Sequence, residues 1–98
     1  MVKVIVGYRL KKGADIQALL LKLRSHAMQY PGFIGAETYI RNKERSIIMV
    51  VYTWQNAENW TAWENSTISQ ELIKEAEHLL EDKPRVAIYT IAPTVRWV

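Results

Sequence analysis

Apolar residues group into four segments typical of β-strands, three of them rich in β-branched residues. The third segment contains a continuous apolar run, Ile47–Tyr52, and is the clearest of them. In chain order the predicted strands are Val2–Leu10, Phe33–Arg41, Ser46–Trp54 and Arg85–Ala92, with Pro93 expected to close the last and Thr94–Val98 to form a tail. The polar turn Asn42–Glu44 joins the second and third strands and predicts a hairpin.

Apolar residues at steps of three and four mark the helices. In the first helix they are Ile16, Leu19, Leu20, Leu23 and Ala27, which predict about four turns ended by Pro31–Gly32. Asp15 lies near the start of this helix, where a carboxylate suits the helix dipole. Asn56 can cap a short helix to about Glu64, and Ser66 or Thr67 can cap another to about Leu80.

The resulting order, strand–helix–strand–strand–helix–strand, is that of the ferredoxin-like α+β fold. It predicts an antiparallel sheet with the first and third strands at its centre and the helices on one face. A chain of 98 residues suffices for one modest core, so residues 1–98 are expected to form a single domain.

The third strand is apolar on both faces. One face carries Ile48, Val50, Tyr52 and Trp54, and the other carries Ile47, Met49 and Val51. Helices on one side of a sheet need only one apolar face, so the second face is expected to be covered by another chain. A second copy is the simplest cover, and we therefore expect a homodimer formed through the sheet face.

Composition and charge exclude several classes of function. The net charge is only +3 and the basic residues are dispersed, so no nucleic-acid partner is expected. The absence of cysteine excludes disulfides and thiolate chemistry, fits a reducing compartment, and leads us to expect a cytoplasmic protein. No apolar run reaches the roughly 18 residues of a membrane span, and the strand-like N-terminus does not suit a signal peptide.

Three short motifs follow one another in order. They are Pro31-Gly32-Phe33-Ile34-Gly35, Val51-Tyr52-Thr53-Trp54-Gln55 and Trp60-Thr61-Ala62-Trp63. Together they resemble the antibiotic-biosynthesis-monooxygenase-like family of dimeric α/β barrels, and the likeness runs from about Val2 to Ala92. The resemblance implies this fold, but several activities share it.

One branch of that family resembles cofactor-free monooxygenases, in which a phenol or quinol substrate itself supplies the electron to oxygen. Such an enzyme needs an apolar slot, a stacking wall and a donor for the phenolate. By resemblance, Trp54 and Trp60 fall where this branch places a Trp and a Tyr, and Lys74 falls near its Arg. Val50 stands where the branch has an Asn, and no cofactor is implied.

A second branch resembles haem-degrading monooxygenases. By resemblance, Trp63 matches the Trp of this branch, but its Asn would fall within Val6–Tyr8, where there is no Asn. Its His ligand would fall at Ile73, which cannot ligate iron.

The candidate binding residues are mostly aromatic, and each could also pack in the core. Of Trp60 and Trp63, one is expected to pack and the other to border a cleft. Tyr8 and Tyr52 share the Trp54 side of the sheet, and their hydroxyls could bond a phenol or quinone oxygen. His26 could act as a base, whereas two histidines without cysteine or paired carboxylates predict no metal site.

The sequence thus predicts a cofactor-independent monooxygenase acting on a small aromatic, phenol or quinol bound between sheet and helices, with its catalytic residues unidentified. The predicted substrate-binding residues are Trp54, Trp60, Trp63, Tyr8, Tyr52, Lys74 and His26. The first alternative is a non-catalytic dimeric protein that binds an apolar ligand in the same cleft, favoured by the lack of recognised polar catalytic groups. The second is haem binding or degradation, which Ile73 disfavours.

Overall fold

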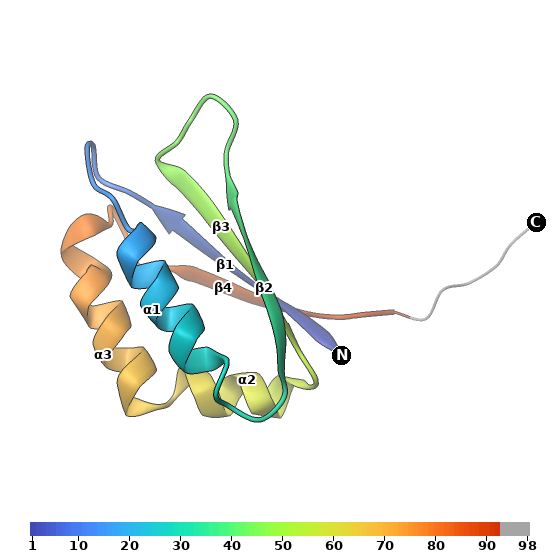
Figure 1. The fold of residues 1–98 in the computed structure, drawn as a ribbon. Coiled ribbons are helices and arrows are strands. Elements are labelled where there is room, and N and C mark those ends of the chain that lie inside the picture. The colour runs from blue at the N-terminus through green and yellow to red at the C-terminus, as the bar shows by residue number, and fades with distance from the viewer. Residues whose placement is uncertain (93–98) are drawn as a thin grey trace, which may run out of the picture.

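A four-stranded antiparallel sheet carries the helices on one of its faces (Figure 1). The computed structural model describes residues 1–92, so Pro93 and the predicted tail lie outside it. The elements are β1 (Val2–Arg9), α1 (Gln17–Ala27), β2 (Phe33–Ile40), β3 (Ile47–Trp54), α2 (Ala57–Glu64), α3 (Thr67–Ala76), a 3₁₀ turn (Glu77–Leu79) and β4 (Arg85–Thr90). This order confirms the ferredoxin-like α+β prediction.

The strand order is β2-β3-β1-β4, with β1 and β3 at the centre as predicted. In the β1–β3 pairing, Val4 lies opposite Tyr52 and Tyr8 lies opposite Ile48. All even-numbered residues of these two strands therefore point to the face under the helices. This register sets which side chains can reach a site between sheet and helices.

The helix boundaries follow local capping. The Asn56 Oδ1 atom accepts a hydrogen bond from the Asn59 N–H at 2.8 Å, and Ser66 Oγ accepts one from the Ser69 N–H at 3.3 Å. The prediction of a four-turn first helix was too long, because α1 spans 11 residues, or about three turns. Beyond Ala27 the chain tightens, since the Tyr30 N–H bonds the Ala27 carbonyl three residues back.

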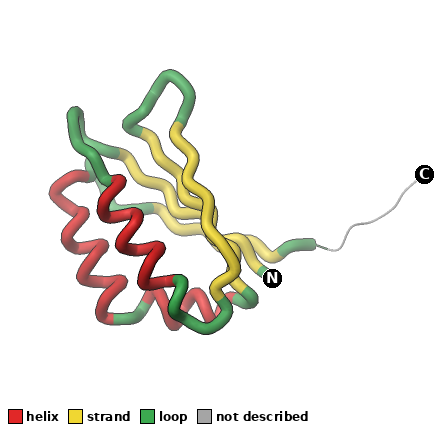
Figure 2. Tube along the Cα trace, viewed as in Figure 1, coloured by secondary structure: helices red, strands yellow, loops and turns green. Residues whose placement is uncertain are grey.

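The helices lie over one face of the sheet (Figure 2). The buried apolar side chains of both layers form the core between them. The predicted inward face of β3, from Ile48 to Trp54, is buried, and the five apolar residues predicted for the first helix are buried as well. Trp54 and Trp63 are among the largest fully buried side chains. None of the helices within residues 1–92 combines the length and the apolar character needed to cross a membrane.

The opposite face of the sheet is apolar at its centre and has no helix over it (Figure 1). Ile5 and Val51 pair there on the two central strands, and Met49 next to them is 38% exposed. Polar groups lie around this apolar centre. The Lys3 Nζ atom donates to Thr53 Oγ1 at 2.6 Å, and the Tyr39 O–H donates to the Glu37 carboxylate at 2.9 Å.

Candidate functional site

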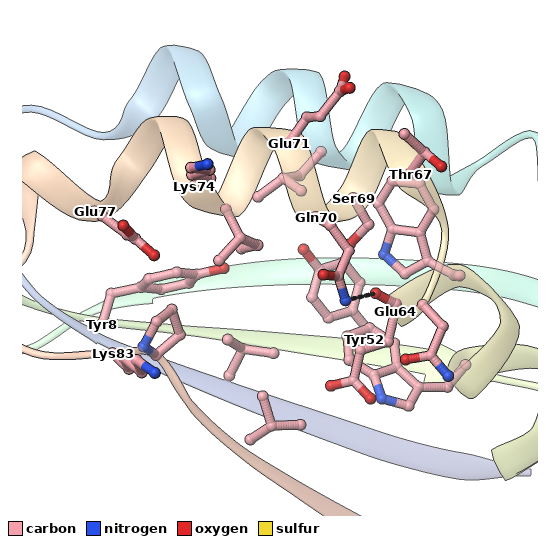
Figure 3. A pocket seen from close by; sticks show the side chains of 18 residues that line it. Tyr8, Tyr52, Glu64, Thr67, Ser69, Gln70, Glu71, Lys74, Glu77 and Lys83 are labelled. Atoms are coloured by element: carbon pink, nitrogen blue, oxygen red, sulfur yellow. Dashed lines mark hydrogen bonds between the residues drawn. The ribbon is translucent and has the colours of Figure 1, made fainter.

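A cleft of about 810 Å³ lies between α3 and the helix-covered face of the sheet (Figure 3). Its volume falls in the range typical of small-molecule sites. The sheet contributes Val6, Tyr8, Tyr52 and Val86; the helices contribute Leu23, Trp60, Trp63, Glu64, Thr67, Ser69, Gln70, Glu71, Ile73 and Lys74; and Asn65, Glu77, Lys83 and Pro84 come from the connecting segments. We call this space the cleft.

Two tyrosine hydroxyls form the polar part of the cleft floor. Tyr8 and Tyr52 are 2% and 3% exposed, and both hydroxyls point toward α3 (Figure 3). Within residues 1–92 neither hydroxyl makes a hydrogen bond to a protein group. Each therefore remains free to bond a molecule in the cleft.

Burial keeps both hydroxyls protonated. It raises the pKa of Tyr52 to about 12, and the positive charge of Arg24 acts against this shift. Burial also raises the pKa of Tyr8, with a smaller contribution from the nearby Tyr52. At neutral pH both groups are hydrogen-bond donors, and neither is available as a base.

The aromatic wall of the cleft comes from α2. The rings of Trp60 and Tyr52 lie 5.5 Å apart at a tilt of 38°, and Trp63 contacts Tyr30 edge to face at 5.1 Å. Behind this wall, Trp54 packs edge to face against Trp60 at 6.1 Å. These contacts fix the indoles of α2 with little freedom to rotate.

The turn before β2 positions α2. Gly32 has φ of +87°, and a Cβ atom there would come within 2.4 Å of the Asn59 side chain. Its carbonyl accepts a hydrogen bond from the Gln55 N–H at 2.7 Å. Glycine is needed at this point both for the backbone conformation and for the close approach of α2.

Charged side chains surround the mouth of the cleft. Lys74, Glu77 and Lys83 gather around Tyr8 at one end, while Glu64 lies near Tyr52 at the other (Figure 3). At that second end the Gln70 Nε2 atom donates to the Glu64 carbonyl at 3.3 Å. Among the described residues, no group of three or more His, Asp or Glu side chains is placed to hold a metal ion.

The structure brings together five of the seven predicted binding residues. Tyr8, Tyr52, Trp60, Trp63 and Lys74 all line the cleft. Both α2 tryptophans border it and both are buried, so the expected division between one packing and one lining residue does not appear.

The other two predicted residues lie elsewhere. Trp54 is fully buried in the core and does not line the cleft, because Trp60 stands in front of it. His26 is exposed on α1 and also lies outside the cleft wall. Val50 is buried under the helices, whereas Ile73 lines the cleft.

Sequence reasoning missed the polar residues Ser69, Gln70 and Lys83. Ser69 and Gln70 lie in the first turns of α3, on which only Lys74 was predicted to bind a ligand. Lys83 lies in the segment that joins the 3₁₀ turn to β4. Nothing in their spacing distinguishes them from ordinary surface residues.

Comparison with known proteins agrees with this architecture. The family model described as antibiotic biosynthesis monooxygenase matches residues 1–75. No curated protein matches the chain.

Solved structures share the fold at low sequence identity. An antibiotic biosynthesis monooxygenase has a TM-score of 0.83 at 16% identity, covering 95% of this chain and 100% of its own. SnoaB, a cofactor-independent oxygenase from Streptomyces nogalater, has a TM-score of 0.83 at 10% identity, covering 96% and 95%. A conserved protein from Methanosarcina mazei Go1 has a TM-score of 0.80 at 17% identity, covering 90% and 89%. With most of its length matched by the family model, the chain belongs to the antibiotic biosynthesis monooxygenase family.

Proposed function

We propose that this protein is a cofactor-independent monooxygenase whose substrate is a small aromatic phenol or quinol bound in the cleft. The observation that carries the proposal is the pair of hydroxyls on the cleft floor, because Tyr8 and Tyr52 are buried residues whose hydroxyls make no hydrogen bond to the protein within residues 1–92. Membership of the family and the fold shared with the oxygenase SnoaB support it.

The two hydroxyls suit an oxygen-bearing aromatic ligand. A neutral tyrosine donates a hydrogen bond to a phenolate or quinone oxygen, and such a bond is stronger when the acceptor is charged. Such bonds favour ionisation of the bound phenol, with its proton released to water, and a phenolate transfers an electron to O₂ more readily than a neutral phenol does. The resembling branch has an Asn where this chain has Val50, which cannot donate a hydrogen bond. In this proposal the two tyrosines donate the hydrogen bonds to the substrate instead.

The apolar walls suit the flat body of such a ligand. Trp60 and Trp63 offer large aromatic surfaces, and Val6, Leu23 and Ile73 complete the apolar lining. Stacking and burial would supply most of the affinity, while the two hydroxyls set the position of the oxygen atoms.

The reaction balances without an external reductant when the substrate is a quinol. One quinol and one O₂ give one hydroxyquinone and one water. The O–O bond, one aromatic C–H bond and the two O–H bonds of the quinol break, and a C–O bond and the O–H bonds of the new hydroxyl and of water form. The quinol supplies all the electrons. Uncatalysed oxidation instead gives the unsubstituted quinone and hydrogen peroxide, so the products distinguish the two processes.

Oxygen uptake tests the proposal. Chelator-treated protein mixed with 1,4-naphthohydroquinone should consume O₂ faster than buffer and without accumulating peroxide. The Tyr8→Phe variant should consume O₂ more slowly than the unchanged protein. The Tyr39→Phe variant, which lacks an exposed hydroxyl on the opposite face of the sheet, should consume it at the unchanged rate. Uptake equal to that of buffer would contradict the proposal.

A non-catalytic binding protein is the second candidate. It is favoured by the absence of an imidazole from the cleft wall, since His26 and His78 both lie outside it. The same aromatics would then bind and release their ligand unchanged. Haem chemistry is less favoured, because Ile73 occupies the position of the family ligand.

We further propose that two copies pair through the open face of the sheet. Ile5, Met49 and Val51 make an apolar centre, and polar residues of both signs, among them Glu37 and Lys3, lie around it. An apolar centre with a polar rim is the usual anatomy of a protein interface. A second copy presents the same apolar centre and polar rim, and its basic side chains can form ion pairs with Glu37. The face is therefore complementary to the same face of another copy.

A further inference from the structure

We propose that the cleft selects aromatic ligands that carry a carboxylate, and that this carboxylate lies at the Tyr8 end between Lys74 and Lys83. The inference rests on the proposed function for the location of the ligand. It adds a second recognition element, a negatively charged substituent, and an orientation for the ligand in the cleft.

The charges of the cleft are unevenly divided between its two ends. Lys74 from α3 and Lys83 from the segment before β4 lie near Tyr8 together with Glu77, whereas Glu64 lies at the Tyr52 end (Figure 3). Glu71 also lines the cleft, but its carboxylate points away from both tyrosines. A negatively charged group is therefore attracted to the Tyr8 end and repelled from the other.

Both lysines are free of ion pairs within the described part of the chain. The carboxylate nearest to Lys83 in the sequence, Asp82, is engaged by Arg9 at 3.0 Å and by Arg85 at 3.9 Å. On α3, Glu75 contacts Lys22 of α1 at 3.9 Å and not Lys74. The two ammonium groups that border the cleft thus remain available to a ligand.

The Tyr8 hydroxyl is an independent observation at the same place. Its side chain is more than nine-tenths buried, its hydroxyl points into the cleft, and it has no protein partner within residues 1–92. A carboxylate there would accept one hydrogen bond from Tyr8 and interact with two cations from opposite walls. Charge-assisted hydrogen bonds of this kind are stronger than neutral ones.

The part of the cleft beyond Tyr8 determines which chemical groups the other end of the ligand can carry. With its carboxylate near Tyr8, an aromatic body would extend toward Trp60 and Tyr52. A ring hydroxyl on the far side would then meet the Tyr52 hydroxyl. A ligand with a carboxylate at one end and a phenol at the other fits this arrangement, and 6-hydroxy-2-naphthoate has that shape.

Binding of matched ligands tests the inference. We would titrate the protein under nitrogen with 6-hydroxy-2-naphthoate and with its neutral analogue 6-hydroxy-2-naphthamide, following tryptophan fluorescence. The carboxylate should bind about fivefold more tightly or better at low salt, and the preference should shrink as salt is added. Lys74→Gln and Lys83→Gln should each reduce the preference, whereas Lys22→Gln, whose lysine pairs away from the cleft, should leave it unchanged.

The outcomes separate this inference from the proposed function. Equal affinity for the two ligands, or a preference that survives in the double variant of Lys74→Gln and Lys83→Gln, would overturn the inference while leaving an aromatic site in place. A carboxylate preference without any oxygen uptake would support the inference and reject the oxygenase. If neither ligand binds, both fail.

Discussion

The side chains of Tyr8 and Tyr52 open into the same cleft although their backbones lie four register positions apart, since Tyr8 pairs with Ile48 and Tyr52 with Val4. Even spacing along two neighbouring strands keeps both residues on one face of the sheet. Two donors separated along the floor can meet two oxygen atoms at different positions on a flat ring system.

Removing either hydroxyl should weaken the binding of a phenolate more than that of an apolar ring. In Tyr8→Phe or Tyr52→Phe the affinity for 1-naphtholate should fall about tenfold, because each variant loses a hydrogen bond to a charged acceptor. Affinity for naphthalene should change little. Fluorescence titration of both ligands measures the difference, and equal losses for the two would show that the tyrosines serve only to pack.

Alkaline pH should destabilise the folded protein through Tyr52. The unfolded chain ionises its tyrosines near pH 10, whereas folded Tyr52 keeps its proton to about pH 12. The unfolded state therefore loses protons first as the pH rises, so the contribution of Tyr52 is complete below about pH 10 and is lost through about pH 12. A shift of this size corresponds to roughly 2–3 kcal/mol.

Urea unfolding on either side of pH 10 measures this effect. The free energy of unfolding should decline less steeply with pH in Tyr52→Phe than in the unchanged protein. Tyr89→Phe is the control, because Tyr89 is exposed and water screens its interactions. Identical pH profiles for Tyr52→Phe and the unchanged protein would contradict the burial of this hydroxyl.

Substitutions of Trp54 and Trp60, which pack edge to face, should distinguish effects on stability from effects on ligand binding. Trp54→Phe and Trp60→Phe each remove part of a buried indole, so both should lower the melting temperature. Only Trp60 lines the cleft, and only its variant should lose affinity for a naphthol, by about threefold to tenfold. An equal loss of affinity in Trp54→Phe would indicate that the wall extends deeper than Trp60.

A charge at the centre of the open sheet face should disrupt the proposed homodimer. In Met49→Asp, burying an unpaired carboxylate between two sheets would cost several kcal/mol. Sedimentation should then show a monomer or an aggregate where the unchanged protein gives a dimer. Leu21→Asp, on the exposed side of α1, is the matched control and should sediment as the unchanged protein does. A stable dimer of Met49→Asp would refute the proposal that the open sheet face forms the dimer interface.

Much of the fold follows from local patterns in the sequence. Alternation along β1 and β3 determines which residues lie under the helices, and Asn56 and Ser66 cap the helices that they were expected to cap. The length of α1 was harder to predict, because Met28 to Tyr30 continue as a tighter turn rather than as a helix. Such fine differences depend on hydrogen bonds that apolar spacing does not encode.

The candidate site was only partly predictable for a different reason. Aromatic residues are recognised as binding candidates from the sequence alone. Whether an indole lines a cleft or packs in the core depends on which neighbouring side chain lies between it and the cleft. Trp60 shields Trp54, and no sequence spacing specifies that order. Lys83 reaches the cleft only because the segment before β4 runs past Tyr8, which is a tertiary relationship.

Isotope labelling of the product tests the central claim most directly. The protein would be supplied with 1,4-naphthohydroquinone under ¹⁸O₂ in unlabelled water, and the product would be analysed by mass spectrometry within the first turnovers. A monooxygenase acting through the cleft should give hydroxynaphthoquinone with one ¹⁸O atom per molecule, and Tyr8→Phe should form it more slowly. Unlabelled naphthoquinone accompanied by labelled hydrogen peroxide, at the rate seen in buffer, would contradict the account.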